Sequence, residues 1–205
     1  MFPTLPQSVQ HELEQLAQRY GQPLVHTADL EANDLFDPLN KTDRYGEVCM
    51  VVRRKNGRLL TMIKTFYPKE AYRLPTGGIN YGESIHDALL RETSEETGLH
   101  VNINRFLAAV AYRVPAVNTQ PLFYTFAFLL DEVSGTLGVI DETERIEAFR
   151  EIEPAELSAL AASLEAVKDE YSDEIDGLWN DWGDFRAVIH RVVWEALEKK
   201  SSQAE

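Results

Sequence analysis

Three scarcities in the sequence exclude broad classes of protein. Cys49 is the single cysteine among 205 residues, so an internal disulfide is excluded and a reducing compartment, the cytoplasm, is expected. It lies in the apolar run 48–52 and is expected to be a core residue rather than a nucleophile. No apolar run approaches the roughly 20 residues that a membrane span requires, and residues 1–20 show no secretion signal, so no membrane partner is expected.

Positive charge is also scarce. The chain carries 20 lysine and arginine residues against 34 aspartate and glutamate residues, which gives a formal net charge of -14 at pH 7. Because the phosphate backbone of nucleic acids attracts lysine and arginine, we expect no nucleic-acid partner. A small phosphate compound stays compatible with the composition, since a divalent cation held by carboxylates can bind phosphate in an acidic protein.

The hydrophobic content of 44% is typical of a folded protein, and the pattern divides the chain into three parts. We expect an N-terminal extension over residues 1–45, a main domain over 46–160 and a C-terminal helical extension over 161–205 packed on that domain. Expected helices cover 8–20, 84–97, 184–198 and a stretch from 154; expected strands cover 47–54, 58–65, 106–113, 122–130 and 146–152. The stretch 26–45 is expected to be irregular.

Two features of this pattern define the expected fold. Asn56-Gly57, between the first two strands, predicts a tight hairpin. The series of strands interrupted by one helix and closed by others predicts an α+β fold, a sandwich in which helices cover both sides of a mixed β-sheet.

The helix over 84–97 carries the first functional signal. It starts with an S-x-x-D capping box and stops before Gly98. Glu92, Glu95 and Glu96 occupy positions i, i+3 and i+4, so their carboxylates share one face of the helix. Like charges at this spacing repel, and a hard divalent cation such as Mg²⁺ or Mn²⁺ between them removes that repulsion. The alternative is a solvated acidic face, which is common on helices.

The surrounding residues favour the metal site over that alternative. Residues 77–99, GGINYGESIHDALLRETSEETGL, match the pattern G-x5-E-x7-R-E-U-x-E-E-x-G-U, in which U is a bulky hydrophobic residue. The chain therefore resembles the Nudix hydrolase family. Thr93 departs from the pattern in the first hydrophobic slot, and Thr76 is an extra residue before the two glycines that usually follow Leu-Pro.

The resemblance implies a Nudix-type α/β/α sandwich that hydrolyses a diphosphate linkage with Mg²⁺ or Mn²⁺. It implies that Glu92 and Glu96 act in catalysis, with Glu92 orienting or deprotonating the attacking water and Arg91 bracing the carboxylates. The implied metal ligands are Glu92, Glu95, Glu96 and a later carboxylate. Glu142, Glu144 and Glu147 lie in the right region for the latter, and we choose Glu144. The implied loop residues are Gly77, Gly78, Gly82 and Glu83. A backbone carbonyl near Thr76 is a further candidate ligand.

The substrate expected from the resemblance is a nucleoside diphosphate linked to another moiety, such as ADP-ribose or a nucleotide sugar. Pro115, sixteen residues past the motif, is a weak indication of ADP-ribose. Two alternatives stay open: a non-catalytic sensor with a Nudix fold, and an isomerase acting on a prenyl diphosphate, for which Cys49 lies in the wrong place. A homodimer is expected from the habit of the family.

The segment near the C-terminus combines tryptophan, arginine and histidine, and its role admits two hypotheses. The cluster of Trp182, Gly183, Phe185 and Arg186, which lies beside His190, could close a substrate pocket by stacking a base and pairing a phosphate. Trp179, Trp182 and Trp194 could instead anchor the last helix to the sheet or to a second subunit. We favour anchoring.

Overall fold

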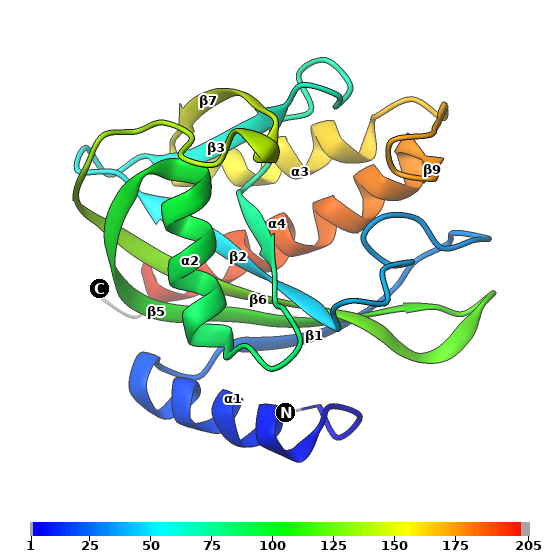
Figure 1. Cartoon of the computed structure of the whole chain (residues 1–205), viewed down its shortest axis with the longest axis horizontal. Helices are drawn as coiled ribbons and strands as arrows, with labels where there is room; N and C mark the ends of the chain where they lie inside the picture. Colours follow the sequence, from blue (N-terminus) through cyan, green and yellow to red (C-terminus); the bar gives the residue numbers. More distant parts are fainter. Residues whose placement is uncertain (1, 202–205) are drawn as a thin grey trace.

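The computed structural model describes residues 2–201, in which one mixed sheet of seven strands forms the centre (Figure 1). Along the chain the elements are α1 (Gln7–Tyr20), β1 (Leu24–Asp29), β2 (Gly46–Arg53), β3 (Leu59–Lys64), β4 (Thr76–Gly78), α2 (Ile85–Thr97), β5 (Leu99–Val114), β6 (Asn118–Gly135), η1 (Glu142–Glu144), β7 (Ile146–Ile152), η2 (Pro154–Glu156), α3 (Leu157–Glu165), β8 (Tyr171–Ser172), β9 (Gly177–Leu178) and α4 (Trp179–Ser201). The η elements are short 3₁₀ turns, and β8 and β9 form a separate two-stranded sheet.

The sheet has the strand order β1-β5-β6-β2-β3-β7, with β4 paired to β2. The pairs β1–β5 and β2–β6 are parallel, whereas β5–β6, β2–β3, β2–β4 and β3–β7 are antiparallel. The sheet is therefore mixed, as expected from the sequence. At the tip of the expected hairpin, the amide of Gly57 donates to the carbonyl of Arg54 over 2.9 Å.

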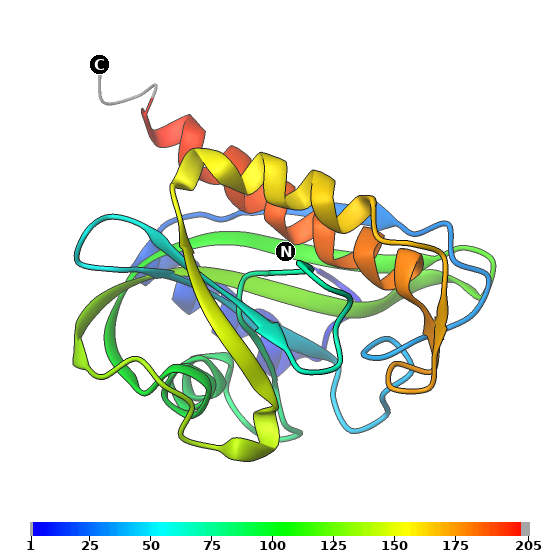
Figure 2. The same cartoon turned by 90° about the horizontal axis from the view of Figure 1, so that it is seen from above.

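Helices cover both faces of this sheet (Figure 2). Helices α3 and α4 lie on one face, and α2 and α1 lie on the other. The α+β sandwich predicted from the sequence is thus confirmed.

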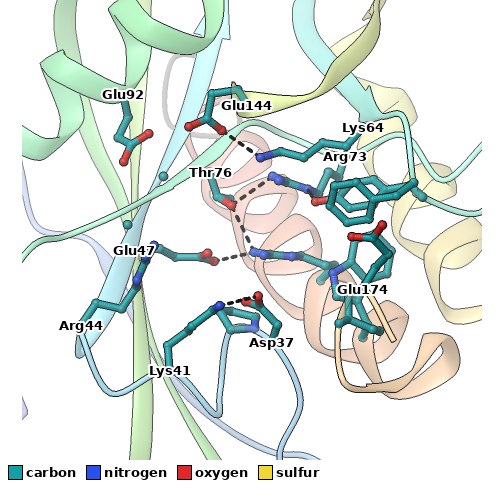
Figure 3. Close-up of a pocket in the computed structure, with 18 of the residues that line it drawn as sticks. Asp37, Lys41, Arg44, Glu47, Lys64, Arg73, Thr76, Glu92, Glu144 and Glu174 are labelled. Carbon is teal, nitrogen blue, oxygen red and sulfur yellow. Dashed lines mark hydrogen bonds and ion pairs between the residues drawn. The ribbon is translucent and has the colours of Figure 1, made fainter. Parts of the chain in front are cut away.

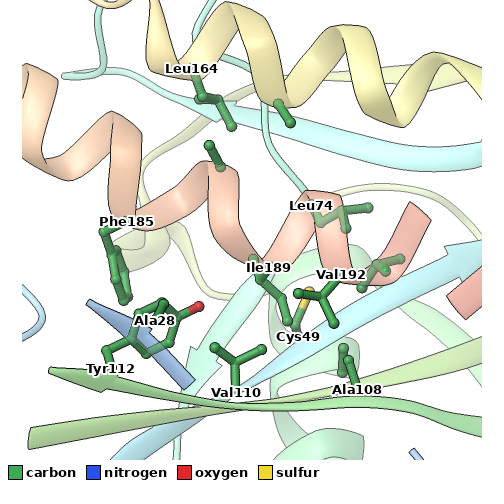
Figure 4. Close-up of a cluster of buried hydrophobic side chains, with 14 of the residues drawn as sticks. Ala28, Cys49, Leu74, Ala108, Val110, Tyr112, Leu164, Phe185, Ile189 and Val192 are labelled. Atoms are coloured by element: carbon green, nitrogen blue, oxygen red, sulfur yellow. The ribbon is translucent and has the colours of Figure 1, made fainter. Parts of the chain in front are cut away.

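Strand β2 shows how the sequence produces two cores. Successive side chains of a strand point to opposite faces. Val48, Met50 and Val52 accordingly pack toward α1 and α2, while Cys49 and Val51 pack toward α3 and α4. Figure 4 shows Cys49 close to Ile189 and Val192 of α4, among buried side chains. The thiol is fully buried, so the expectation of a core cysteine is confirmed.

Several expected boundaries were wrong. Strand β1 lies partly in a stretch that was expected to be irregular. The sequence does not indicate a strand there, because only Ala28 of its residues is buried and it has no alternating apolar pattern. Its parallel pairing with β5 defines it as a strand. Strands β5 and β6 extend well beyond their expected ends as one long antiparallel pair. Helix α4 begins at Trp179 rather than at 184.

Within residues 2–201 no helix is long and apolar enough to cross a membrane.

Candidate active site

A pocket of ≈ 420 Å³ lies where α2, α4, η1 and the loop before β2 meet (Figure 3). Glu92 from α2 and Glu144 from η1 lie on one side of it. Arg73, which follows β3, and Arg186 of α4 line it as well. We call Glu92, Glu144 and the nearby Glu96 the acidic side, and Arg73 with Arg186 the arginine pair.

Helix α2 carries two of its glutamates on its buried face. Its apolar residues Ile85, Ala88 and Leu89 are fully buried against the sheet, and Glu92 and Glu96 continue the same stripe at helical spacing. The helix is held at both ends: the Ser84 hydroxyl accepts from the amide of Asp87, and Gly98 ends it in the left-handed conformation. The local signals read from the sequence therefore direct two carboxylates inward.

Gly77 and Gly78 allow close approach of two charged side chains to the glycine-rich loop. A Cβ atom at Gly77 would overlap the carboxylate of Glu92, and one at Gly78 would overlap the guanidinium of Arg44. Gly82 has a φ of +82°, which favours glycine in the turn before α2. The glycine-rich loop thus lies directly against Glu92 because Gly77 has no side chain, and Gly78 leaves room for Arg44 in the same way.

Arg91 joins the carboxylates of α2 to the preceding loop. It binds Glu83 through two hydrogen bonds of 2.7 and 2.8 Å, and it donates to Glu92 over 2.8 Å and to Glu95 over 3.0 Å. It also donates to the carbonyl of Gly78. The hydrogen bond from Arg91 lowers the pKa of Glu83 below its usual value. Arg91 therefore has the bracing contacts that the sequence comparison implied.

Glu96 lies in an environment that favours a bound cation. Its side chain is fully buried, and neither carboxylate oxygen has a hydrogen-bond partner among the described residues. Burial raises its pKa to about 8, and burial also raises the pKa of Glu92. The nearest cation is Lys64, whose Nζ lies 3.9 Å from Oε1 of Glu96. Two buried oxygens without partners are costly unless a cation or a proton satisfies them.

The four candidate ligands do not share one environment. Glu144 lines the pocket and binds Nζ of Lys64 over 2.9 Å. Glu95 does not line the pocket, and its side chain, 37% exposed, is paired with Arg91. Among residues 2–201 no three carboxylates, imidazoles or thiols are arranged as a ready metal-binding cluster. The oxygens of Glu92, Glu96 and Glu144 nevertheless suit Mg²⁺ or Mn²⁺ by their hard-donor chemistry.

Arg73 was not identified from the sequence, whereas Arg186 belongs to the segment for which pairing with a phosphate was one of two hypotheses. Arg73 is 2% exposed and Arg186 is 6% exposed. Arg186 forms an ion pair of 2.7 Å with Glu47, which also accepts from Thr125. The hydroxyl of Thr76 accepts from Nη1 of Arg73 over 3.0 Å and from Nη1 of Arg186 over 3.2 Å. No local pattern marks these residues, because their burial follows from the packing of α4 on the sheet.

The tryptophans and the histidine of α4 have packing roles. Trp179 and Trp182 are buried in the core beside α3 and α4, and Trp194 packs against it, so anchoring of the helix to the sheet is confirmed. His190 is fully buried; its Nδ1 donates to the carbonyl of Arg186, and its Nε2 accepts from the amide of Leu74. Trp182 and Arg186 also line the pocket, and a role of this segment in substrate binding stays a prediction.

Comparison with known families agrees with this geometry. The family model for the NUDIX domain matches residues 44–175. The chain belongs to the Nudix family. The resemblance drawn from the motif is thereby confirmed, and with it the assignment of the chain to a family of hydrolases.

Individual Nudix relatives are distant. An ADP-ribose pyrophosphatase of Methanocaldococcus jannaschii is 27% identical over 138 residues, which cover 67% of this chain and 77% of the relative. An RNA pyrophosphohydrolase of Baumannia cicadellinicola is 37% identical over 65 residues, 32% of this chain and 40% of the relative. The crystal structure of an ADP-ribose pyrophosphatase from Streptococcus suis has a TM-score of 0.44 and 15% identity, and the match covers 74% of this chain and 90% of that one. The homodimer and the lack of a nucleic-acid partner stay predictions.

Proposed function

We propose that this Nudix protein is a divalent-metal-dependent pyrophosphohydrolase that cleaves a nucleoside diphosphate linked to another moiety, with ADP-ribose as the first candidate substrate. The observation that carries the proposal is the buried carboxylate of Glu96 without hydrogen-bond partners, beside the pocket that Glu92 and Glu144 line. The name of the archaeal relative supports ADP-ribose.

The carboxylates have distinct proposed roles. Glu96, Glu92 and Glu144 would hold Mg²⁺ or Mn²⁺, and Glu95 would join them through the network of Arg91. The bound metal would neutralise phosphate oxygens and lower the pKa of a water molecule. Arg91 holds Glu92 in a fixed orientation, which is the main requirement of phosphoryl transfer.

Glu92 is the proposed base. It lines the pocket, and the hydrogen bond from Arg91 fixes the orientation of its carboxylate. The proton of the attacking water passes to Glu92 as the water oxygen bonds to phosphorus. The bond from that phosphorus to the bridging oxygen breaks, and two phosphate monoesters leave the pocket.

A substrate panel tests this proposal. The wild-type protein is incubated with ADP-ribose, nucleotide sugars and a 5′-triphosphorylated RNA, each with Mg²⁺, with Mn²⁺ or with a chelator, and phosphate monoesters are measured. We expect metal-dependent release of a nucleoside monophosphate, with the RNA inactive. The variant Glu96→Gln should keep the fold and lose about two orders of magnitude in turnover.

The same panel separates hydrolysis from the sensor alternative. A sensor would bind a nucleotide without releasing a product under any metal condition. Turnover in Glu96→Gln close to that of the wild type would refute the assignment of roles, even if the wild type is active.

A further inference from the structure

Arg73 is a buried positive charge without an ion-pair partner in the described part of the chain, although its charge opposes the effect of burial that raises the pKa of Glu96. It is 2% exposed, yet no carboxylate of residues 2–201 lies within the 4.0 Å of an ion pair with it, unlike the other four pocket cations. Lys41 pairs with Asp37, Arg44 with Asp43, Lys64 with Glu144 and Arg186 with Glu47. A buried charge is costly unless it is paired, so an anionic partner at Arg73 would stabilise it.

The hydrogen bonds of Arg73 are all to neutral groups. Its Nε donates to the hydroxyl of Tyr67 over 3.0 Å, and its Nη1 donates to the carbonyl of Leu74 over 2.8 Å and to Thr76. Nη2 donates to none of the described residues. Arg73 also lines the pocket, so it has a donor to offer to a ligand there.

Arg186 adds a second donor group at the same place. Thr76 accepts from both guanidinium groups, so the two side chains converge on one hydroxyl. Nε of Arg186 is buried and has no hydrogen-bond partner among residues 2–201. Because Glu47 balances only one of the two charges, the arginine pair with Glu47 keeps one net positive charge.

From these contacts we propose that Arg73 and Arg186, aligned by Thr76, form a binding site for a phosphate group of the substrate on the side of the pocket away from Glu92. The inference rests on the proposed function, because it names how that pocket recognises its substrate. Two planar guanidinium groups match the oxygens of a phosphate better than ammonium groups do.

The position of Thr76 places this site next to the acidic side. Thr76 touches the arginine pair, and Gly77, the next residue, lies directly against the carboxylate of Glu92. Figure 3 shows Arg73 and Glu92 on opposite sides of Thr76. One diphosphate can therefore reach both sides, with one phosphate near Glu92 and another group at the arginine pair.

Binding without metal tests the proposal independently of hydrolysis. Inorganic pyrophosphate is titrated into the full-length protein in the presence of a chelator, and its affinity is measured by calorimetry. We expect the wild type to bind and Arg73→Gln to bind about tenfold or more weakly, because a charge-assisted contact is lost. Arg73→Lys should recover part of the affinity. Arg113→Ala, which removes a partly exposed arginine that lies outside the pocket and is paired with Asp29, is the control and should bind like the wild type.

A second variant guards against misfolding. If the melting temperature shows that Arg73→Gln is unfolded, Thr76→Val keeps both charges and removes only the shared acceptor; it should weaken pyrophosphate binding by a smaller factor. Equal affinity in the wild type, Arg73→Gln and Thr76→Val would overturn the proposal, and so would the absence of binding by the wild type. An intact arginine effect in a protein that hydrolyses no nucleotide would instead refute the proposed function alone.

Steady-state kinetics then identifies which phosphate is bound. Arg73→Gln is compared with the wild type on ADP-ribose and on ADP-ribose that carries an additional phosphate on its terminal ribose. An increase in KM for both substrates assigns the site to the diphosphate, and an increase for the second alone assigns it to the terminal phosphate. Unchanged KM for both would overturn the role in substrate binding.

Discussion

The two sides of the pocket solve the problem of buried charge in different ways. On the acidic side, Glu92 is held by Arg91 while Glu96 is left with two oxygens that no described residue satisfies. In the arginine pair, Arg186 is neutralised by Glu47 whereas Arg73 has only neutral partners. On the acidic side Glu92 and Glu144 are both paired and only Glu96 lacks a hydrogen-bond partner among the described residues; in the arginine pair Arg186 is paired and Arg73 is not. This comparison indicates that the paired side chains fix the geometry of the pocket, whereas the unpaired carboxylate is available to a cation and the unpaired guanidinium to an anion.

The largest expected effect is a loss of stability when Arg186, the ion-paired arginine of the pocket, is replaced. Arg186→Ala leaves the carboxylate of Glu47, 4% exposed, without its counter-charge. We expect the free energy of unfolding to fall by about 3–5 kcal/mol, measured by urea denaturation. The double variant Glu47→Gln with Arg186→Gln should lose clearly less, because no charge stays buried. A loss below about 1 kcal/mol in the single variant would show that this pair does not stabilise the fold.

Replacing Glu96, the carboxylate without hydrogen-bond partners, should change how strongly Mg²⁺ stabilises the fold. Mg²⁺ at 100 times its Kd should stabilise the wild type by about 2.7 kcal/mol, and Glu96→Gln should lose most of this gain. Without metal, the variant should be at least as stable as the wild type, because it no longer buries a carboxylate without partners. Melting curves with and without Mg²⁺ check both points. An equal shift of Tm by Mg²⁺ in both proteins would remove Glu96 from the metal site.

A side chain added next to Glu92 should lower the turnover number more than the stability of the fold. Gly77→Ala introduces a Cβ atom where the carboxylate of Glu92 lies, and a displacement of about 1 Å at a catalytic group can cost 10²-fold in rate. We expect kcat to fall by about one to two orders of magnitude. Gly138→Ala is the matched control, because no atom lies near the position of its Cβ, and it should keep the wild-type rate.

A further expected effect is a loss of stability in acid on the arginine side. Burial lowers the pKa of His190 to about 3 from an ordinary value of 6.5. Below about pH 6.5 the unfolded chain takes up a proton that the folded chain does not, so stability falls as the pH decreases. The expected slope is about 1.4 kcal/mol per pH unit down to about pH 3.

The variant His190→Gln should lack that component of the slope, measured by denaturation between pH 7 and pH 4. Since neutral His190 accepts from the amide of Leu74 and donates to the carbonyl of Arg186, its protonation would loosen the backbone at both arginines. Parallel pH profiles in the two proteins would contradict this role.

The sequence predicts the acidic side much better than the arginine pair, for a physical reason. The residues that form α2, cap it and brace its carboxylates lie between Gly77 and Gly98, so helix period and spacing are sufficient to find them. Glu144 was chosen only by its distance from the motif, and the structure does bring it to the pocket. Its role as a metal ligand stays a prediction.

The rest depends on packing that no local pattern encodes. Arg73 and Arg186 are 113 positions apart in a chain of 205 residues, and they meet because α4 crosses the sheet over β5. An isolated arginine is normally exposed, so nothing in the composition marks either one as buried. Strand β1 was missed for a similar reason, since its partner strand rather than its own residues makes it a strand.

The hydroxyl of Thr76 has a consequence for changes of specificity. The residue is the single insertion relative to the usual motif, and it connects the two halves of the pocket through one backbone unit. Replacing it removes the acceptor shared by the two guanidinium groups without altering any ionisable group, so substitutions at this position should change the orientation of both arginines while the carboxylates of α2 stay in place.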